Sequence, residues 1–453
     1  MVRPGHTVKR RGTAGPVGVT ASRQAALAIL TDVRQGALLD AAFDRRTEAL
    51  DLRDRRWVHE LVWGVLRTRA SLDALIATRV RGGLGVLHAE VLELLRLGAQ
   101  QLLAMGSVPA YAAIGQTVEL VKARHGVGAA RLVNAVLRRI DRERSAGELE
   151  IAEPADSLAA LAQRTSHPLW VVARWVARWG MAEAAQLLEA NNGAAPIILR
   201  PYGVATEVLA AQLAAESVTT TPVALTGDSL QLPPGVALTT LGAFREGCCF
   251  VQDPAATLVA RYADIPEGST VADLCAAPGG KALELSRRAA RVLCADRSPA
   301  RVARMTAGFT RVGTTRLQPL VADATAPAIA PVDMVLLDVP CTGTGTFRRH
   351  PDARWRLQIS DLAVLGAAQR AILAGAARVV RPGGLLVYST CSLEPEENDA
   401  VVDAFLAAHG DFSLEPPAPG TVPASVLDEG RLRVLPQRHG HDGAFAARLR
   451  RAA

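Results

Sequence analysis

The stretch VADLCAAPGGKALELS, residues 271–286, decides the fold of the second half of the chain. It predicts a hydrophobic strand that ends at Asp273–Leu274, a turn rich in Pro and Gly, and a helix that starts near Lys281. Glycines in such a turn let the backbone approach a ligand closely, and the first turn of the helix offers unpaired N–H groups. The stretch therefore indicates a ligand-binding turn between a strand and a helix.

Strands and helices continue to alternate after this stretch. Four later segments, ARVLCAD, LQPLVAD, VDMVLLDVP and GGLLVYSTC, read as strands that end in a polar residue or a cysteine. Helical segments separate them, which is typical of a parallel, doubly wound sheet with its ligand at the carboxyl ends of the strands. Asp296 ends the next strand, where a carboxylate can accept hydrogen bonds from ribose hydroxyls. The turn and this acid together favour a nucleoside cofactor, and the absence of GxGxxG argues against NAD.

The first third of the chain has a helical pattern. Apolar residues recur at helical spacing in RWVHELVWGVL and AEVLELLRLGAQQLLAM, with no strand signal between such segments, which predicts a helical bundle. In the middle of the chain, Trp170, Trp175 and Trp179 also follow helical spacing, which favours a packed helix face over a stacking platform for bases. We expect five parts: a disordered basic arm at 1–20, a helical domain at 21–142, a linker at 143–157, a small α/β region at 158–250 and the α/β domain at 251–453.

Positive charge is concentrated in the first third of the chain. Residues 1–150 contain 23 Lys and Arg against 15 Asp and Glu, whereas the whole chain has a net charge of +7. Such a surface suits a polyanion such as RNA, although a solvated face with a basic tail explains the same count. No segment reads as a signal peptide or a membrane helix, so we expect a cytoplasmic protein without a membrane partner. No Cys/His cluster has metal-ligand spacing, so no metal is expected.

Two cysteines and a carboxylate follow the ends of predicted strands. Cys341 and Cys391 each lie just beyond a strand, and Asp338 precedes Cys341 by three residues. Carbon 5 of cytosine is a poor nucleophile, but addition of a thiolate at carbon 6 makes it electron-rich enough to accept a methyl group. Asp338 could protonate N3 of the ring to ease that addition. The residues alone do not rank the two cysteines, and a structural role explains either cysteine taken alone.

Lys281 is one of only three lysines among 51 basic residues, the others being Lys9 and Lys122. A compact ammonium fits a crowded site that a planar guanidinium does not. We therefore expect Lys281 to serve cofactor binding, with compositional chance as the alternative.

The segments DLCAAPGGK, DVPCTGTG and YSTCS followed by PEEN resemble the signature of RNA 5-methylcytosine methyltransferases of the bacterial ribosomal RNA small-subunit methyltransferase B type. The helical segments DRRWVHELVWGVLR and RLVNAVLRRI are similar to the NusB-like RNA-binding domain of these proteins, so the resemblance spans essentially the whole chain. It implies an all-α NusB-like bundle, a small α/β middle region and a Rossmann-like class I methyltransferase domain. It also implies S-adenosylmethionine as cofactor and a specific cytosine of 16S ribosomal RNA as target.

The resemblance also implies roles for individual residues. Cys391 matches the nucleophile, Cys341 the cysteine that assists product release, and Asp338 the acid that borders the cofactor and faces the target base. Asp296 matches the acid that binds ribose, and Asp323 the residue near the adenine. The methionine and ribose side of the cofactor pocket matches Cys275, Ala276, Ala277, Pro278, Gly279, Gly280 and Lys281.

Two other functions fit parts of this pattern. A DNA cytosine-5 methyltransferase shares the chemistry, but the NusB-like domain favours RNA. A non-catalytic RNA-binding factor for ribosome assembly predicts decay at the costly positions, whereas both cysteines, Asp338 and the cofactor turn are intact. For either nucleic acid we expect a flipped-out base, because ring chemistry cannot proceed inside a stack.

Overall fold

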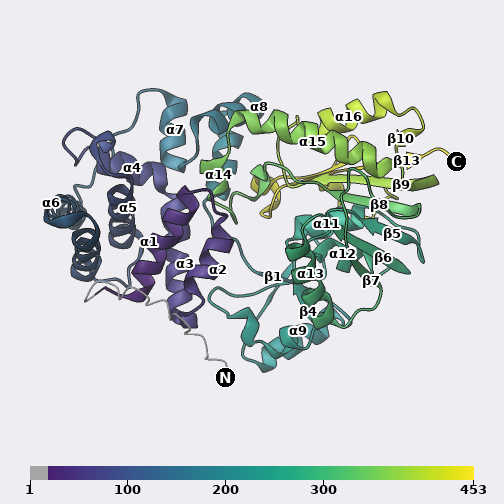
Figure 1. Cartoon of the computed structure of the whole chain (residues 1–453), viewed down its shortest axis with the longest axis horizontal. Coiled ribbons are helices and arrows are strands. Elements are labelled where there is room, and N and C mark those ends of the chain that lie inside the picture. The colour runs from purple at the N-terminus through teal and green to yellow at the C-terminus, as the bar shows by residue number, and fades with distance from the viewer. Residues whose placement is uncertain (1–18) are drawn as a thin grey trace, which may run out of the picture. The chain divides into compact units, whose positions relative to one another are not determined.

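The computed structural model describes residues 19–453, so nearly all of the basic arm predicted at 1–20 lies outside the described residues. The chain divides into two compact units, one ending at Leu169 and the other running from Trp170 to Ala453. Figure 1 labels their helices and strands. The predicted domain borders stay predictions.

The first unit is helical over its described residues, as the periodicity predicts. Its elements are α1 (Ala21–Arg34), α2 (Leu39–Thr47), α3 (Leu52–Arg67), α4 (Arg69–Ala77), η1 (Leu84–Val86), α5 (Ala89–Ala104), α6 (Ala110–Ala146) and α7 (Ser157–Thr165). The helix α5 packs against α1, α3, α4 and α6, and it is buried almost all round because apolar side chains cover most of its surface. Arg96, buried on α5, is neutralised by Asp73 and Glu93, with N–O distances of 2.7 Å.

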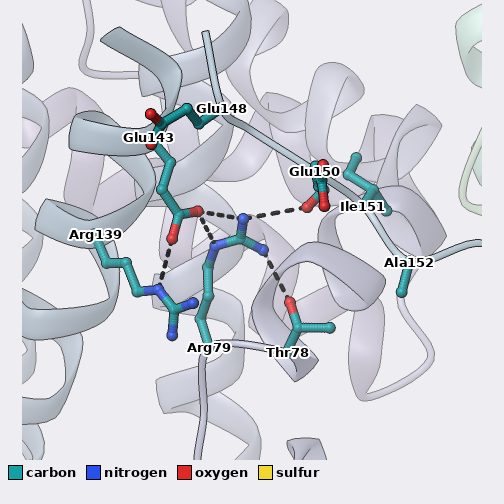
Figure 2. Close-up of a pocket in the computed structure, with 8 residues that line it drawn as sticks. All are labelled: Thr78, Arg79, Arg139, Glu143, Glu148, Glu150, Ile151 and Ala152. Atoms are coloured by element: carbon teal, nitrogen blue, oxygen red, sulfur yellow. Dashed lines mark hydrogen bonds and ion pairs between the residues drawn. The ribbon is translucent and has the colours of Figure 1, made fainter. Parts of the chain in front are cut away.

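Arg79 connects the segment after α6 to the helical unit through an ion pair and a hydrogen bond (Figure 2). Its side chain is only 4% exposed and forms an ion pair with Glu143 near the end of α6. The same guanidinium donates to the backbone oxygen of Glu150 at 3.2 Å. Further along, Gln163 of α7 donates to the backbone oxygen of Ala152 at 2.7 Å. The stretch predicted to be a linker is therefore tied to the first unit by hydrogen bonds.

A small antiparallel sheet opens the second unit. The strands β1 (Ile198–Pro201), β2 (Thr221–Val223), β3 (Ser229–Gln231) and β4 (Cys249–Val251) lie in the order β2-β3-β1-β4. The accompanying helices are α8 (Leu169–Ala190), α9 (Thr206–Ala215), η2 (Leu238–Thr240) and α10 (Gly242–Arg245). Trp175 of α8 is 1% exposed, and its Nε1 donates to Glu394 at 2.9 Å, which agrees with a packed helix face.

The large sheet of the second unit has a parallel half and an antiparallel half. Its strands are β5 (Thr270–Asp273), β6 (Arg291–Asp296), β7 (Leu317–Val321), β8 (Val332–Asp338), β9 (Val380–Thr390), β10 (Phe412–Leu414), β11 (Leu427–Asp428), β12 (Arg431–Val434) and β13 (Ala444–Arg451). The order is β11-β12-β13-β9-β8-β5-β6-β7, with β10 beside β13. Strands β5 to β9 are parallel, as predicted, whereas β13 runs antiparallel to β9, and β10 and β12 run antiparallel to β13.

Helices cover both faces of this sheet. The helices of this part of the chain are α11 (Pro254–Tyr262), α12 (Gly280–Leu285), α13 (Pro299–Val312), η3 (Thr344–Thr346), α14 (Ala353–Arg356), α15 (Ile359–Ala377), α16 (Asp399–Ala408), η4 (Ala424–Val426) and α17 (Pro436–His439). Neighbouring residues of a strand point to opposite faces, so Leu336 and Leu337 belong to different hydrophobic clusters. Helices α11, α12 and α13 contribute side chains to the first cluster, on one face of the sheet. Helices α15 and α16 contribute to the second cluster, on the other face (Figure 1).

The order of the parallel strands fixes where a ligand can bind. From β5 the chain builds β6 and β7 on one side and then crosses to place β8 and β9 on the other. The carboxyl ends of β5 and β8 therefore flank a topological switch point, where open α/β sheets form their binding crevice.

The helix α15 is long and apolar enough to cross a membrane by length and composition alone. Core helices of soluble proteins pass the same test, and α15 packs against β8 and β9.

We predict that Arg79→Ala frees residues 147–156 and destabilises the first unit by about 2 kcal/mol, because it removes a largely buried cation from Glu143 and leaves only Arg139 beside that carboxylate. Thermal unfolding and limited proteolysis of the full chain measure the two effects. Arg142→Ala, an exposed change on α6, is the control. Equal melting and equal cleavage of the two variants would contradict the role of Arg79.

Candidate active site

The two predicted cysteines meet beyond the carboxyl ends of β8 and β9. In the parallel register of these strands Asp338 lies opposite Ser389, so both loops leave the sheet at the same level. The sulfur atoms of Cys341 and Cys391 lie 3.3 Å apart, and both residues are partly exposed. The sequence predicts that both cysteines lie at the same edge of the sheet. The structure shows in addition that the two sulfur atoms are in contact.

Gly345 lets the two cysteine loops approach. Its N–H donates to the backbone oxygen of Cys391 at 2.9 Å, and its own oxygen accepts from the N–H of Gly443 at 2.8 Å. A Cβ atom at position 345 would lie 2.7 Å both from the oxygen of Cys391 and from Cα of Gly443. Only glycine fits there without moving the backbone that presents the thiol.

Lys281 and Asp338 form the charged part of the site. The ammonium of Lys281, at the start of α12, lies 2.7 Å from one oxygen of Asp338, and the hydroxyl of Ser389 donates to the other oxygen at 3.1 Å. Burial alone would lower the pKa of Lys281, but the Asp338 carboxylate outweighs it and the pKa is raised. The Cys391 sulfur adds to this rise, so the ammonium is close to both groups.

The Cys341 thiol is held in its protonated form. Its hydrogen bond with Cys391 raises the pKa of Cys341 well above the ordinary value, and burial raises it further. Negative charge on Cys391, Glu397 and Asp338 acts in the same direction. Ionisation of one thiol therefore opposes ionisation of the other.

A cavity of about 410 Å³ opens beside the switch point. Of the predicted cofactor-binding residues, the cavity wall contains Cys275, Ala276, Ala277, Pro278, Gly280, Lys281 and Asp338. Gly279 lies behind the wall, with φ of 107°, and a Cβ atom there would meet the ring of Phe309 at 2.6 Å. Phe309 itself lines the cavity, so this glycine lets the loop pack against the ring.

The other two predicted cofactor-binding residues, Asp296 and Asp323, lie outside the wall of this cavity. Asp296 is buried at the end of β6, accepts from the N–H of Ser298 at 2.9 Å and pairs with Arg301 at 2.9 Å. Asp323 is exposed and accepts from the backbone and the hydroxyl of Thr325 at 2.8 Å. Neither residue is part of the cavity wall.

Asp273 is a site residue that sequence reasoning did not single out. It ends β5, is 1% exposed and lines the cavity, and neither of its carboxylate oxygens has a hydrogen-bond partner among the described residues. Burial, with a further contribution from the charge of Asp338, raises the pKa of Asp273 to about 7. The only signal in the sequence is the position of Asp273 at the strand end before the turn.

Arg349 brings a second pair of unforeseen acids to the cavity. Its guanidinium lies 2.6 Å from Asp253 and 2.5 Å from Asp442. Burial and the neighbouring Asp253 raise the pKa of Asp442 to about 6. Asp253 caps the N-terminus of α11 and Asp442 precedes β13, so nothing local in the sequence indicates that the fold brings them together.

Between residues 19 and 453, no three His, Cys, Asp or Glu side chains are grouped so as to hold a metal ion.

Family models match three successive parts of the chain. Residues 20–142 match the NusB family, residues 167–239 a ferredoxin-like domain of RsmF/B-like methyltransferases, and residues 262–450 the model described as 16S rRNA methyltransferase RsmB/F.

Curated relatives match over nearly the full length. The probable ribosomal RNA small subunit methyltransferase B of Synechocystis sp. is 36% identical over 447 residues, which cover 95% of this chain and 99% of the relative. The ribosomal RNA small subunit methyltransferase B of Thermus thermophilus is 35% identical over 437 residues, covering 95% and 97%.

Solved structures share the architecture. The crystal structure of PH0851 is 26% identical and covers 96% of this chain and 100% of its own, with a TM-score of 0.78. NSun6 from Pyrococcus horikoshii, solved with SFG, is 20% identical and has a TM-score of 0.56 over 62% of this chain and 97% of its own, which is a likeness of fold alone.

We predict that Asp273→Asn stabilises the cofactor-free protein above pH 7, by up to roughly 4 kcal/mol. The folded-state pKa of about 7 exceeds the unfolded value, so folded Asp273 retains a proton that the unfolded chain releases, and stability falls as the pH rises from about 4 to 7. Urea unfolding from pH 4 to pH 8 measures the difference, which should vanish near pH 4. Glu246→Gln, at an exposed site, is the control. A gain independent of pH would contradict the shifted titration of Asp273.

Proposed function

The chain belongs to the ribosomal RNA small subunit methyltransferase B family, and on that basis we propose that it methylates carbon 5 of a specific cytosine in 16S ribosomal RNA. In this proposal the methyl group comes from S-adenosylmethionine, and the reaction passes through a covalent bond between Cys391 and the cytosine. The observation that carries the proposal is the 3.3 Å contact of Cys341 and Cys391 beside the Lys281–Asp338 pair.

The cavity at the switch point fits S-adenosylmethionine. The cofactor carries an α-ammonium group, and Asp273 offers two buried, unpartnered oxygens in the cavity wall. Phe250 and Phe309 supply apolar surface, and the loop from Cys275 to Lys281 supplies the close backbone approach. When bound, S-adenosylmethionine supplies an electrophilic methyl group. Binding of the ribose by Asp296 requires Arg301, which is 46% exposed, to share or release that carboxylate.

The side chains at the strand ends suit the proposed reaction. The Cys391 sulfur adds to carbon 6 of the cytosine, and Asp338 faces the ring. N3 gains a proton from the Asp338 carboxyl and returns it there when the sulfur–carbon bond breaks. Carbon 5, now electron-rich, forms the bond to the methyl group. Loss of the proton at carbon 5 and cleavage of the sulfur–carbon bond then restore the aromatic ring and free Cys391.

Electrostatics favour Cys391 as the sulfur that adds. The thiolate is the nucleophilic form, and because the two sulfur atoms are in contact, ionisation of one thiol opposes ionisation of the other. The ammonium of Lys281 lies close to Cys391 and stabilises negative charge there. Once the Cys391 sulfur is bonded to carbon 6 it no longer carries charge, so the pKa of Cys341 falls. The Cys341 thiol can then release its own proton to solvent and, as a thiolate, accept the proton of carbon 5.

The helical first unit is the proposed RNA-binding part, since it carries the positive excess of the sequence and matches the NusB family. A cytoplasmic location, where ribosomal RNA is found in bacteria, stays a prediction.

We predict that Cys391→Ser abolishes methyl transfer, by roughly 10³-fold or more, and forms no covalent complex with RNA. Cys341→Ser should instead accumulate a protein–RNA adduct, because the carbon 5 proton and the sulfur–carbon bond are not released. Labelled S-adenosylmethionine with RNA, DNA or neither, followed by denaturing gels, measures both outcomes. Cys248→Ser, outside the site, is the control. The reverse pattern would mean swapped roles, and label in DNA, or in neither nucleic acid, would contradict the proposed function.

We predict that Lys281→Arg weakens S-adenosylmethionine binding about tenfold, because the bulkier guanidinium does not fit between Asp338 and Cys391 in the buried site. Calorimetric titration of the purified protein measures the affinity without any turnover. Lys122→Arg is the matched control, since the Lys122 side chain is 54% exposed on α6. Affinities within a factor of two for the two variants would show that Lys281 has no special role in cofactor binding.

A further inference from the structure

Glu397 lies fully buried against the loop that carries Cys341. It follows Cys391 by six residues, immediately before Asn398 and the helix α16. Its carboxylate accepts a hydrogen bond from the N–H of Thr342 at 2.9 Å and a second from the hydroxyl of Thr342, the residue next to Cys341. The chain segment that carries one cysteine therefore holds the loop that carries the other.

Neutral side chains also bond to the Glu397 carboxylate and to the Cys341 loop. Gln369 of α15 donates through its Nε2 to the Glu397 carboxylate and to the backbone oxygen of Pro340, both at 2.9 Å. The hydroxyl of Thr342 also lies 3.1 Å from that of Ser392, the residue next to Cys391. Within the described chain, every side-chain or backbone group that donates to the Glu397 carboxylate is uncharged. Hydrogen bonds from neutral groups therefore solvate its negative charge, and the cation of Arg370 lies near Tyr388, whose hydroxyl donates to the backbone oxygen of Glu397.

This charge lies near a thiol. The ionisable groups that act most strongly on Cys341 are Cys391, Glu397 and Asp338, and all three raise its pKa. The hydrogen bond with Cys391 and burial are the largest causes of the raised pKa of Cys341, and the charge of Glu397 adds to them. The nearby cation, Lys281, is bonded to Asp338 and acts on Cys391.

We infer that Glu397 is a positioning residue for the cysteine pair: it holds the Cys341 loop in place and keeps the shared proton on the Cys341 sulfur. The inference deepens the proposed function and rests on it for its purpose. When one thiol of this pair has ionised, the two sulfur atoms, 3.3 Å apart, compete for the one remaining proton, and the negative charge of Glu397 favours its retention on Cys341. The ammonium of Lys281 lies close to Cys391, so the two charged groups act differently on the two cysteines.

The test measures the titration of Cys341 directly. In a Cys391→Ser background, iodoacetamide modification of Cys341 is followed by mass spectrometry of its peptide from pH 6 to pH 11. Adding Glu397→Gln keeps the size and an acceptor oxygen but removes the charge, so we expect the midpoint to fall by about one pH unit and the rate below it to rise about tenfold. Adding Glu394→Gln is the matched control. Glu394 is equally buried in the same segment, but it bonds Trp175 and Arg174 away from the thiols.

A midpoint unchanged by Glu397→Gln, or shifted equally by Glu394→Gln, would overturn the inference. Glu397→Asp separates charge from loop packing, because aspartate keeps the charge but its shorter side chain withdraws from Thr342. We expect the Cys341 midpoint to stay near that of the parent in this variant while amide exchange of the loop at 341–345 becomes faster. A fall as large as that of Glu397→Gln would mean that loosening alone controls Cys341, which also overturns the inference.

The result is independent of the proposed function. Alkylation requires neither RNA nor cofactor, so the titration can support the role of Glu397 even if no cytosine is methylated. Conversely, adduct formation by Cys341→Ser together with an unchanged Cys341 titration in Glu397→Gln would leave the proposed function standing and remove Glu397 from it.

Discussion

The parallel pairing of β8 with β9 is the constraint on which the site depends. Adjacent strands lie about 4.8 Å apart, and the register places Asp338 opposite Ser389, so both cysteine loops start side by side. A slip of one residue would turn every side chain of one strand to the other face and carry Asp338 away from Lys281. The loops must still converge to bring the sulfur atoms to 3.3 Å, which is why the glycine at Gly345 is required.

The second constraint is an excess of negative groups in a desolvated space. Asp338 and Glu397 lie near the two thiols, Asp273 lies near Asp338, and Lys281 is the only lysine of the second unit. Such an arrangement raises the pKa of whichever acid is least solvated, and it suits a positively charged ligand. The fold therefore controls which of these acids and thiols carry a proton, as well as where their atoms lie.

The sequence predicts the residues whose role depends on strand position, and it does not predict those whose role depends on burial. Cys341, Cys391 and Asp338 each follow a hydrophobic strand, so their common edge follows from the order of strands and loops along the chain. Glu397 could not be found in this way. The run PEEN contains Glu396 and Glu397 side by side, yet Glu396 is half-exposed and pairs with Arg174, whereas Glu397 is buried against Thr342.

The antiparallel half of the sheet shows the same limit. The segment HGHDGAFAARLRR carries three arginines and an aspartate, yet β13 lies between β9 and β12. Arg448 is buried there because the Glu415 carboxylate and three backbone oxygens of the chain accept its hydrogen bonds. Those partners are remote in sequence, so only the folded chain explains how Arg448 is buried.

Two thiols in contact are also an oxidisable pair. A disulfide bond requires a sulfur–sulfur distance of about 2.05 Å, so Cys341 and Cys391 would need to approach by roughly 1.3 Å. An oxidant that removes two electrons and two protons from the pair would eliminate both thiols of the proposed mechanism in one step. The closeness that serves the proposed chemistry therefore makes the protein dependent on reducing surroundings, and its activity must be measured with a thiol reductant present.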